Sequence, residues 1–171
     1  REYVPGDPFK NINWKAFART GDLMINEKCR DAVTDLYIIL DSRDIARIGT
    51  VLKNPLEMGT VAAASLASFF IQRRDSVSLT IYDEKLSFLP PDTGDKQYFK
   101  ILSSLAGVAP RGTMPLQAVT NSLAARFSRG SPVFIISSCE GDGTVPSAVR
   151  DLVGRGHEVT VLSPSSIDFE R

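Results

Sequence analysis

The sequence predicts an α/β fold: an open, doubly wound, mostly parallel sheet of the Rossmann type with helices on both faces. Short apolar runs at residues 36–41, 76–82, 132–137 and 158–162 have the length and composition of buried strands. Segments with helical periodicity or helix-end signals lie between them, at residues 55–74, 95–106, 115–127 and 145–155. Alternation of strands with helices is the pattern of parallel sheets covered on both sides.

The first half of this pattern begins with a central strand at residues 36–41, which is apolar on both faces and ends in Asp41. Residues 42–54 are polar and are predicted to be irregular. Pro55 opens a long helix that reaches about Arg74, since proline is favoured in the first helical turn. The apolar face predicted for this helix contains Met58, Val61, Ala62, Leu66, Phe69 and Phe70. Gly59 and the alanines are expected to allow a close approach to the sheet.

The second half begins with residues 76–82, where alternating apolar side chains predict a strand that ends at Asp83. A turn then leads to an antiparallel edge strand at residues 85–89, which Pro90 and Pro91 are expected to end. Residues 95–106 and 115–127 are predicted helices, and residues 132–137 a buried strand. A helix at residues 145–155 is expected to end near Gly156, before a last strand at residues 158–162.

Composition excludes several classes of function. The 171 residues fit one domain, and 20 Lys and Arg balance 20 Asp and Glu, so the basic excess typical of nucleic-acid binding is absent. Cys29 and Cys139 lie far apart and His157 is the single histidine, a set that supports neither a disulfide framework nor a zinc site. The longest uncharged run, residues 58–72, is shorter than the roughly 20 residues needed to cross a bilayer.

The first 23 residues carry a dense motif of fixed residues at fixed spacing. Its positions are Arg1, Tyr3, Pro5, Gly6, Asp7, Ile12, Trp14, Ala18, Arg19, Gly21 and Leu23. This segment resembles the signature of the DUF58 family, which couples it to a von Willebrand factor A-like domain. The resemblance implies an N-terminal signature arm at residues 1–34, packed on a von Willebrand A-like domain at residues 35–171.

The resemblance also implies a function. It suggests a non-catalytic protein–protein interaction module that assists assembly with a MoxR-type AAA+ ATPase. Because the chain begins inside the motif, we expect it to be a soluble cytoplasmic part of a longer protein. Relatives carry transmembrane helices upstream, so the parent protein is expected to be anchored in a membrane.

Von Willebrand A-like domains hold a hard divalent cation at the strand ends, at a metal-ion-dependent adhesion site. The resemblance assigns its ligands to D-x-S-x-S after the first strand, a Thr before a helix, and an Asp after a later strand. This chain keeps Asp41 and Thr113, but Arg43 and Ile45 stand at the serine positions and Ser138 where an aspartate is common. We therefore expect a degenerate site and no cofactor, with Mg²⁺ left as an open alternative.

Other oxygen-bearing side chains leave Mg²⁺ binding open as the alternative. Ser42, Asp44, Glu140 or Asp142 could supply oxygen ligands if the loops shift in register. Arg43 instead predicts a guanidinium close to Asp41, in the position of the cation.

Two other interpretations of these residues stay open. Asp41 and Thr113 can act as loop and helix caps in a purely structural domain. A hydrolytic enzyme would use Asp41 and the strand-end loops, although Arg43 stands where an aspartate-nucleophile phosphatase needs a second acid. The chain has no nucleophile elbow around a serine, no P-loop and no dinucleotide fingerprint, which favours the non-catalytic interpretation.

The signature arm has two interpretations. Tyr3, Asp7, Trp14 and Arg19 can pack the arm on the main domain, and in that case we expect Trp14 to be buried. The same aromatic and arginine side chains also suit a docking surface for another subunit.

Overall fold

The computed structural model describes residues 3–4, 12–25, 33–44 and 54–164. The chain divides into two compact units, residues 1–32 and residues 33–171. This division lies within two residues of the predicted boundary between arm and domain.

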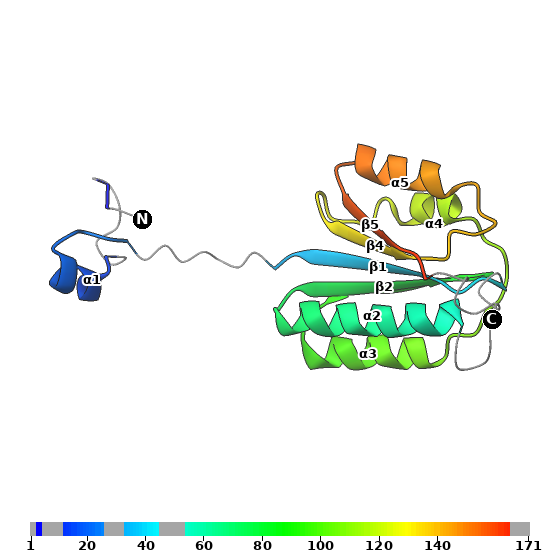
Figure 1. The fold of residues 1–171 in the computed structure, drawn as a ribbon, viewed down its shortest axis with the longest axis horizontal. Helices are drawn as coiled ribbons and strands as arrows, with labels where there is room; N and C mark the ends of the chain where they lie inside the picture. Colours follow the sequence, from blue (N-terminus) through cyan, green and yellow to red (C-terminus); the bar gives the residue numbers. More distant parts are fainter. Residues whose placement is uncertain (1–2, 5–11, 26–32, 45–53, 165–171) are drawn as a thin grey trace. The chain divides into compact units, whose positions relative to one another are not determined.

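The second unit contains a five-stranded sheet in the order β3-β2-β1-β4-β5 (Figure 1). Its strands are β1 (Asp35–Asp41), β2 (Ser76–Tyr82), β3 (Leu86–Asp92), β4 (Pro132–Ile136) and β5 (Glu158–Leu162). β1 is central and pairs in parallel with β2 on one side and β4 on the other, while β3 is the antiparallel edge. The predicted mostly parallel α/β sheet, with residues 36–41 at its centre, is confirmed.

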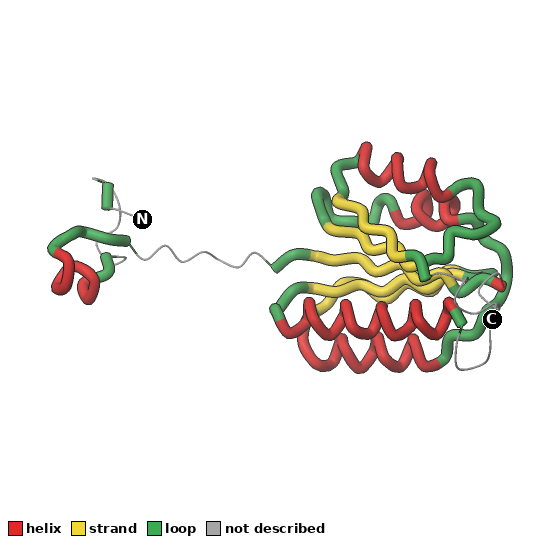
Figure 2. The backbone as a smooth tube through the Cα atoms, viewed as in Figure 1, coloured by secondary structure: helices red, strands yellow, loops and turns green. Residues whose placement is uncertain are grey.

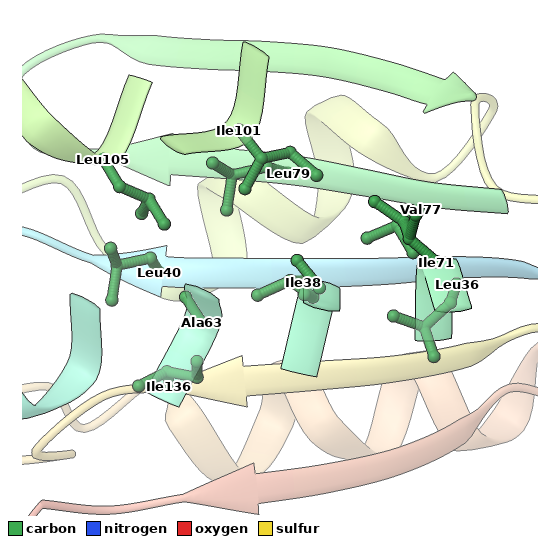
Figure 3. Packing of buried hydrophobic residues seen from close by; sticks show 11 residues of the cluster. Leu36, Ile38, Leu40, Ala63, Ile71, Val77, Leu79, Ile101, Leu105 and Ile136 are labelled. Carbon is green, nitrogen blue, oxygen red and sulfur yellow. The ribbon is translucent and has the colours of Figure 1, made fainter. Parts of the chain in front are cut away.

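Two helices cover each face of this sheet (Figures 1 and 2). α2 (Pro55–Gln72) and α3 (Gly94–Ala106) lie on one face, and α4 (Leu116–Leu123) and α5 (Val145–Gly154) lie on the other. Alternate residues of β1 supply both cores: Leu36, Ile38 and Leu40 face α2 and α3, whereas Tyr37 and Ile39 face α4 and α5. Figure 3 shows the first core, in which Ala63, Ile101 and Leu105 pack against the strand side chains. The double burial explains why β1 is apolar on both faces.

The prediction for the buried face of α2 was half right: Ala62, Leu66 and Phe70 pack against the core, but the other three residues do not. Met58, Val61 and Phe69 are 49%, 58% and 54% exposed, so they do not form the main contact with the sheet. The buried residues of this helix are Pro55, Leu56, Gly59, Ala63, Ala67 and Ile71. Small side chains allow the helix to lie close to the sheet, which is visible at Gly59, where an added Cβ would be 3.1 Å from Leu40 Cδ1.

Two element boundaries differ from the prediction by more than two residues. β3 continues through Pro90 and Pro91 to Asp92, because an edge strand tolerates residues that lack an N–H. α4 ends at Leu123, four residues earlier than expected. Phe127 is nevertheless buried, and its ring lies 4.4 Å from that of Tyr37. Gly156 takes φ +88° and donates its N–H to Val153, as expected for a residue that ends a helix.

The first unit contains a short helix, α1 (Trp14–Thr20), which the sequence analysis did not predict. Asn13 caps its start by accepting the Ala16 N–H at 3.0 Å, and Gly21 ends it in the left-handed conformation. Within this unit Trp14 is 58% exposed and contacts Phe17 edge-on, with 6.2 Å between ring centroids. Packing of the arm on the main domain, with Trp14 buried there, stays a prediction.

Candidate functional site at the strand ends

Arg43 is the central side chain at the carboxyl end of the sheet. It follows the last residue of β1 by two positions, and its side chain is 3% exposed. Its Nε donates to Asp41 Oδ1 at 2.9 Å and its Nη2 to Asp41 Oδ2 at 2.6 Å, a two-pronged pair with one carboxylate. The planar guanidinium matches a carboxylate in this way, which a lysine cannot do.

The third contact of Arg43 crosses to another loop. Its Nη1 donates to Asp142 Oδ2 at 2.9 Å, and both side chains are 3% exposed. Asp142 lies 99 residues further along the chain, in the loop before α5. One buried cation therefore joins the end of β1 to the loop that follows β4.

Asp142 also organises the starts of two helices. Its Oδ2 accepts the N–H of Leu116, the first residue of α4, at 2.9 Å. Its Oδ1 accepts the N–H of Thr144 at 2.9 Å and the Thr144 hydroxyl at 2.5 Å, directly before α5. A carboxylate at helix N-termini satisfies free N–H groups and interacts favourably with the helix dipoles. The Arg43 contact thus reaches both helices of one face.

Asp41 has no free carboxylate oxygen. Oδ1 accepts the backbone N–H of Arg43 at 3.1 Å in addition to its Nε. Oδ2 accepts the hydroxyl of Ser137, just after β4, at 2.6 Å in addition to Nη2. Asp41 is 8% exposed, so these partners replace the water that a carboxylate would otherwise bind.

The ionisation of the cluster follows from these contacts. Burial alone lowers the pKa of Arg43, but the Asp41 hydrogen bonds and the neighbouring acidic groups raise it by more, so the pKa is above its usual value. Burial likewise raises the pKa of Asp142, but the bonds from Thr144 and Leu116 and the Arg43 charge lower it by more, so the pKa is below its usual value. These shifts favour the charged forms of both Arg43 and Asp142.

Tyr82, the last residue of β2, forms one wall of the cluster. Its ring centroid lies 5.4 Å from the Arg43 guanidinium carbon, a cation–π distance. Burial raises the pKa of its hydroxyl. That hydroxyl has no hydrogen-bond partner among the described residues, although it is fully buried.

The structure brings only some of the predicted site residues together. Ser42 is buried, but its hydroxyl donates to the Tyr82 carbonyl at 3.1 Å and is directed away from Asp41. Thr113 is exposed and forms no side-chain hydrogen bond with any described residue, so the expectation that it caps α4 was wrong. Ser138 is half-buried, and its carbonyl accepts from the Ser163 hydroxyl at 3.2 Å. Among the signature residues, Arg1, Pro5, Gly6 and Asp7 lie outside the described residues.

Tyr82 was missed by the sequence analysis, and Asp142 was named only as a substitute ligand. A signal for Asp142 was present, because an aspartate side chain often accepts the backbone N–H two residues later, here directly before a helix. Ser137 stands at the end of the strand predicted at residues 132–137, but its contact with Asp41 and the role of Tyr82 depend on strand pairing and have no local pattern. Within residues 3–4, 12–25, 33–44 and 54–164, no group of three or more His, Cys, Asp and Glu side chains is arranged to hold a metal ion.

The chain matches one family and is similar to several solved structures. The model of the family described as "Protein of unknown function DUF58" matches residues 1–165. An aerotolerance-related membrane protein from Bacteroides fragilis has 22% identity and a TM-score of 0.62, covering 76% of this chain and 67% of that one. The hypothetical protein BatB from Bacteroides thetaiotaomicron has 20% identity and a TM-score of 0.61, covering 76% and 66%.

A third similar structure has the von Willebrand A fold. The von Willebrand A domain of SpRpn10 has 10% identity and a TM-score of 0.52, covering 78% of this chain and 89% of that domain. The chain spans about two thirds of the length of the two Bacteroides proteins. No curated protein matches the chain. None of the described helices is long and apolar enough to cross a membrane.

Proposed function

The chain belongs to the DUF58 family and has a von Willebrand A-like fold, and on this premise we propose that it is a non-catalytic protein–protein interaction module. Its metal-ion-dependent adhesion site is degenerate, because the Arg43 guanidinium takes the place of the cation. The observation that carries this proposal is the contact of Arg43 with both Asp41 and Asp142 at 2.6–2.9 Å.

The chemistry of the cluster supports the proposal. A divalent cation at this place would need the oxygens of Asp41, Ser137 and Asp142, all of which hold partners. It would also have to displace a permanent positive charge, since Arg43 does not lose its proton. The residues present therefore do not fit Mg²⁺ unless Arg43 leaves the cluster, and no cofactor is assigned.

The same contacts speak against the hydrolytic alternative. A nucleophile or general base needs an accessible lone pair, but both Asp41 oxygens accept two hydrogen bonds each. We keep Asp41 as a structural acid that holds Arg43. A purely structural domain is the remaining alternative, and it differs from our proposal only in the absence of a partner.

The partner we propose is a MoxR-type AAA+ ATPase, on the family resemblance, with a parent protein anchored in a membrane and this segment on the cytoplasmic side. The partner would meet the strand-end loops around the Arg43 cluster, whose contacts need no metal ion. Preorganised loops lower the ordering cost of binding.

A binding experiment can test this surface. Thr113→Arg adds bulk and charge at an exposed position of the strand-end loops, with no side-chain hydrogen bond to lose. Asn121→Arg adds the same side chain on the exposed side of α4, where it also removes a hydrogen bond from the Gln117 amide, and is the control. We expect Thr113→Arg alone to abolish binding of the purified ATPase in surface plasmon resonance. Binding that is unchanged by both substitutions would reject the strand-end surface.

A further inference from the structure

A polar cavity lies at the same end of the sheet as the Arg43 cluster and has Ser42 in its lining. Its volume is about 260 Å³ and it lies beside the last turn of α3. Its lining includes Ser42, Ile81, Asp83, Ser87, Val108 and Arg111. Neither the family resemblance nor the proposed function uses this cavity.

Backbone hydrogen bonds fix its walls. Arg111 N–H donates to the Ser42 carbonyl at 2.9 Å, and Met114 N–H donates to the Asp83 carbonyl at 3.3 Å. Between them, Gly112 has φ +67°, and an added Cβ would lie 2.5 Å from the Glu84 backbone nitrogen. The loops after β1, β2 and α3 are thus held together, and the cavity is preformed.

Two opposite charges line the cavity without meeting each other. Asp83 Oδ1 accepts the Lys85 N–H at 2.7 Å, which leaves Oδ2 without a partner among the described residues. Arg111 is exposed, and its guanidinium forms no ion pair or hydrogen bond with any residue that the structure describes. Opposite charges that share a cavity but remain unpaired can both be satisfied by a ligand that carries both signs.

We propose that this cavity binds a free α-amino acid as its zwitterion. The ligand carboxylate would accept from the Arg111 guanidinium, and the ligand ammonium would donate to Asp83 Oδ2. Ile81 and Val108 supply an apolar wall for an aliphatic side chain. The volume is below the roughly 300–1,000 Å³ of drug-sized pockets, so the ligand is small. Leucine binding by the purified chain would not require the proposed protein partner.

Titration of the ¹⁵N-labelled chain with L-leucine, followed by NMR, tests the proposal. We expect saturable shifts of the Arg111 Nε–H signal and of the loop amides. Leucine amide lacks the carboxylate and N-acetyl-leucine lacks the ammonium, and each should bind about tenfold more weakly, which is the loss of one charge-assisted hydrogen bond.

Two substitutions test whether leucine binds in this cavity. Arg111→Gln and Asp83→Asn should each weaken leucine binding about tenfold, whereas Arg129→Gln, an exposed arginine elsewhere, should not. The amide introduced by Asp83→Asn keeps an oxygen for the Lys85 N–H, so the turn survives. The proposal is overturned by the absence of saturable shifts, by equal affinity for N-acetyl-leucine, or by binding that neither variant weakens.

Discussion

Arg43 Nη2 lies 2.6 Å from Asp41 Oδ2, and the same guanidinium reaches Asp142 from the other side. These contacts bury the permanent positive charge of Arg43 at the carboxyl end of the sheet. A buried ion pair is weak evidence of net stability, but removal of one partner leaves the other charge uncompensated. Substitution of Arg43 therefore tests how much these contacts contribute to stability.

Arg43→Met should destabilise the domain by about 3–5 kcal/mol, because it leaves two buried carboxylates without their cation. Urea unfolding followed by circular dichroism measures the change. Arg73→Met is the control: Arg73 is 63% exposed and 3.7 Å from Asp75, so its loss should cost less than about 1 kcal/mol. Equal effects of the two substitutions would show that the Arg43 contacts contribute little.

The separation in sequence between contacting residues explains which features could be predicted from the sequence. The strands and the central position of residues 36–41 were predictable, because apolar runs and alternation are local signals. The proximity of Arg43 to Asp41 was also expected, since they are two residues apart. Asp142 and Ser137 lie 99 and 96 residues from their partners, so only strand pairing brings them together. The close approach of Gly59 and the alanines of α2 was expected, but the helical pattern wrongly placed Met58, Val61 and Phe69 on the buried face.

Acid stability should depend on Asp142. Because its pKa is lowered in the folded state, its contribution to stability is complete above the unfolded pKa of about 3.9 and is lost as pH falls through the lower folded value. Wild type should therefore lose stability below about pH 4, and Asp142→Asn should be less stable at pH 7 with a flatter dependence in this range. Thermal unfolding at a series of pH values measures this. Parallel curves for the two proteins would contradict the assignment.

Gly112 should tolerate no side chain. Gly112→Ala adds a Cβ that would lie 2.5 Å from the Glu84 N and 2.8 Å from the Asp83 carbonyl carbon, at φ +67°. Gly130 has a similar φ of +70° with nothing within 4 Å, so Gly130→Ala isolates the conformational cost of about 1–2 kcal/mol. We expect Gly112→Ala to cost clearly more than Gly130→Ala in denaturant melts. Equal losses of stability in the two variants would show that the backbone at Asp83 and Glu84 moves to make room for the added Cβ without strain.

Trp14 offers a direct test of the predicted arm packing. It is the single tryptophan, so its fluorescence reports its environment without interference. On the prediction that the arm packs on the main domain, its emission should be blue-shifted and protected from acrylamide, and Trp14→Ala should cost about 3–5 kcal/mol. An emission maximum typical of water, with full quenching, would favour the docking interpretation of the signature arm.

The last prediction concerns Mg²⁺. Since Arg43 holds the carboxylates of Asp41 and Asp142, wild type should show no shift of its melting temperature on addition of millimolar Mg²⁺. Arg43→Ser removes the cation and leaves those carboxylates beside the Ser137 hydroxyl, an oxygen set that suits a hard divalent ion. We expect Mg²⁺ to stabilise this variant, since a ligand at 100 times its Kd adds about 2.7 kcal/mol. Arg73→Ser, made at an exposed arginine, controls for general salt effects. Micromolar Mg²⁺ binding by wild type that Asp41→Ala abolishes would show that other loop oxygens complete the site despite Arg43.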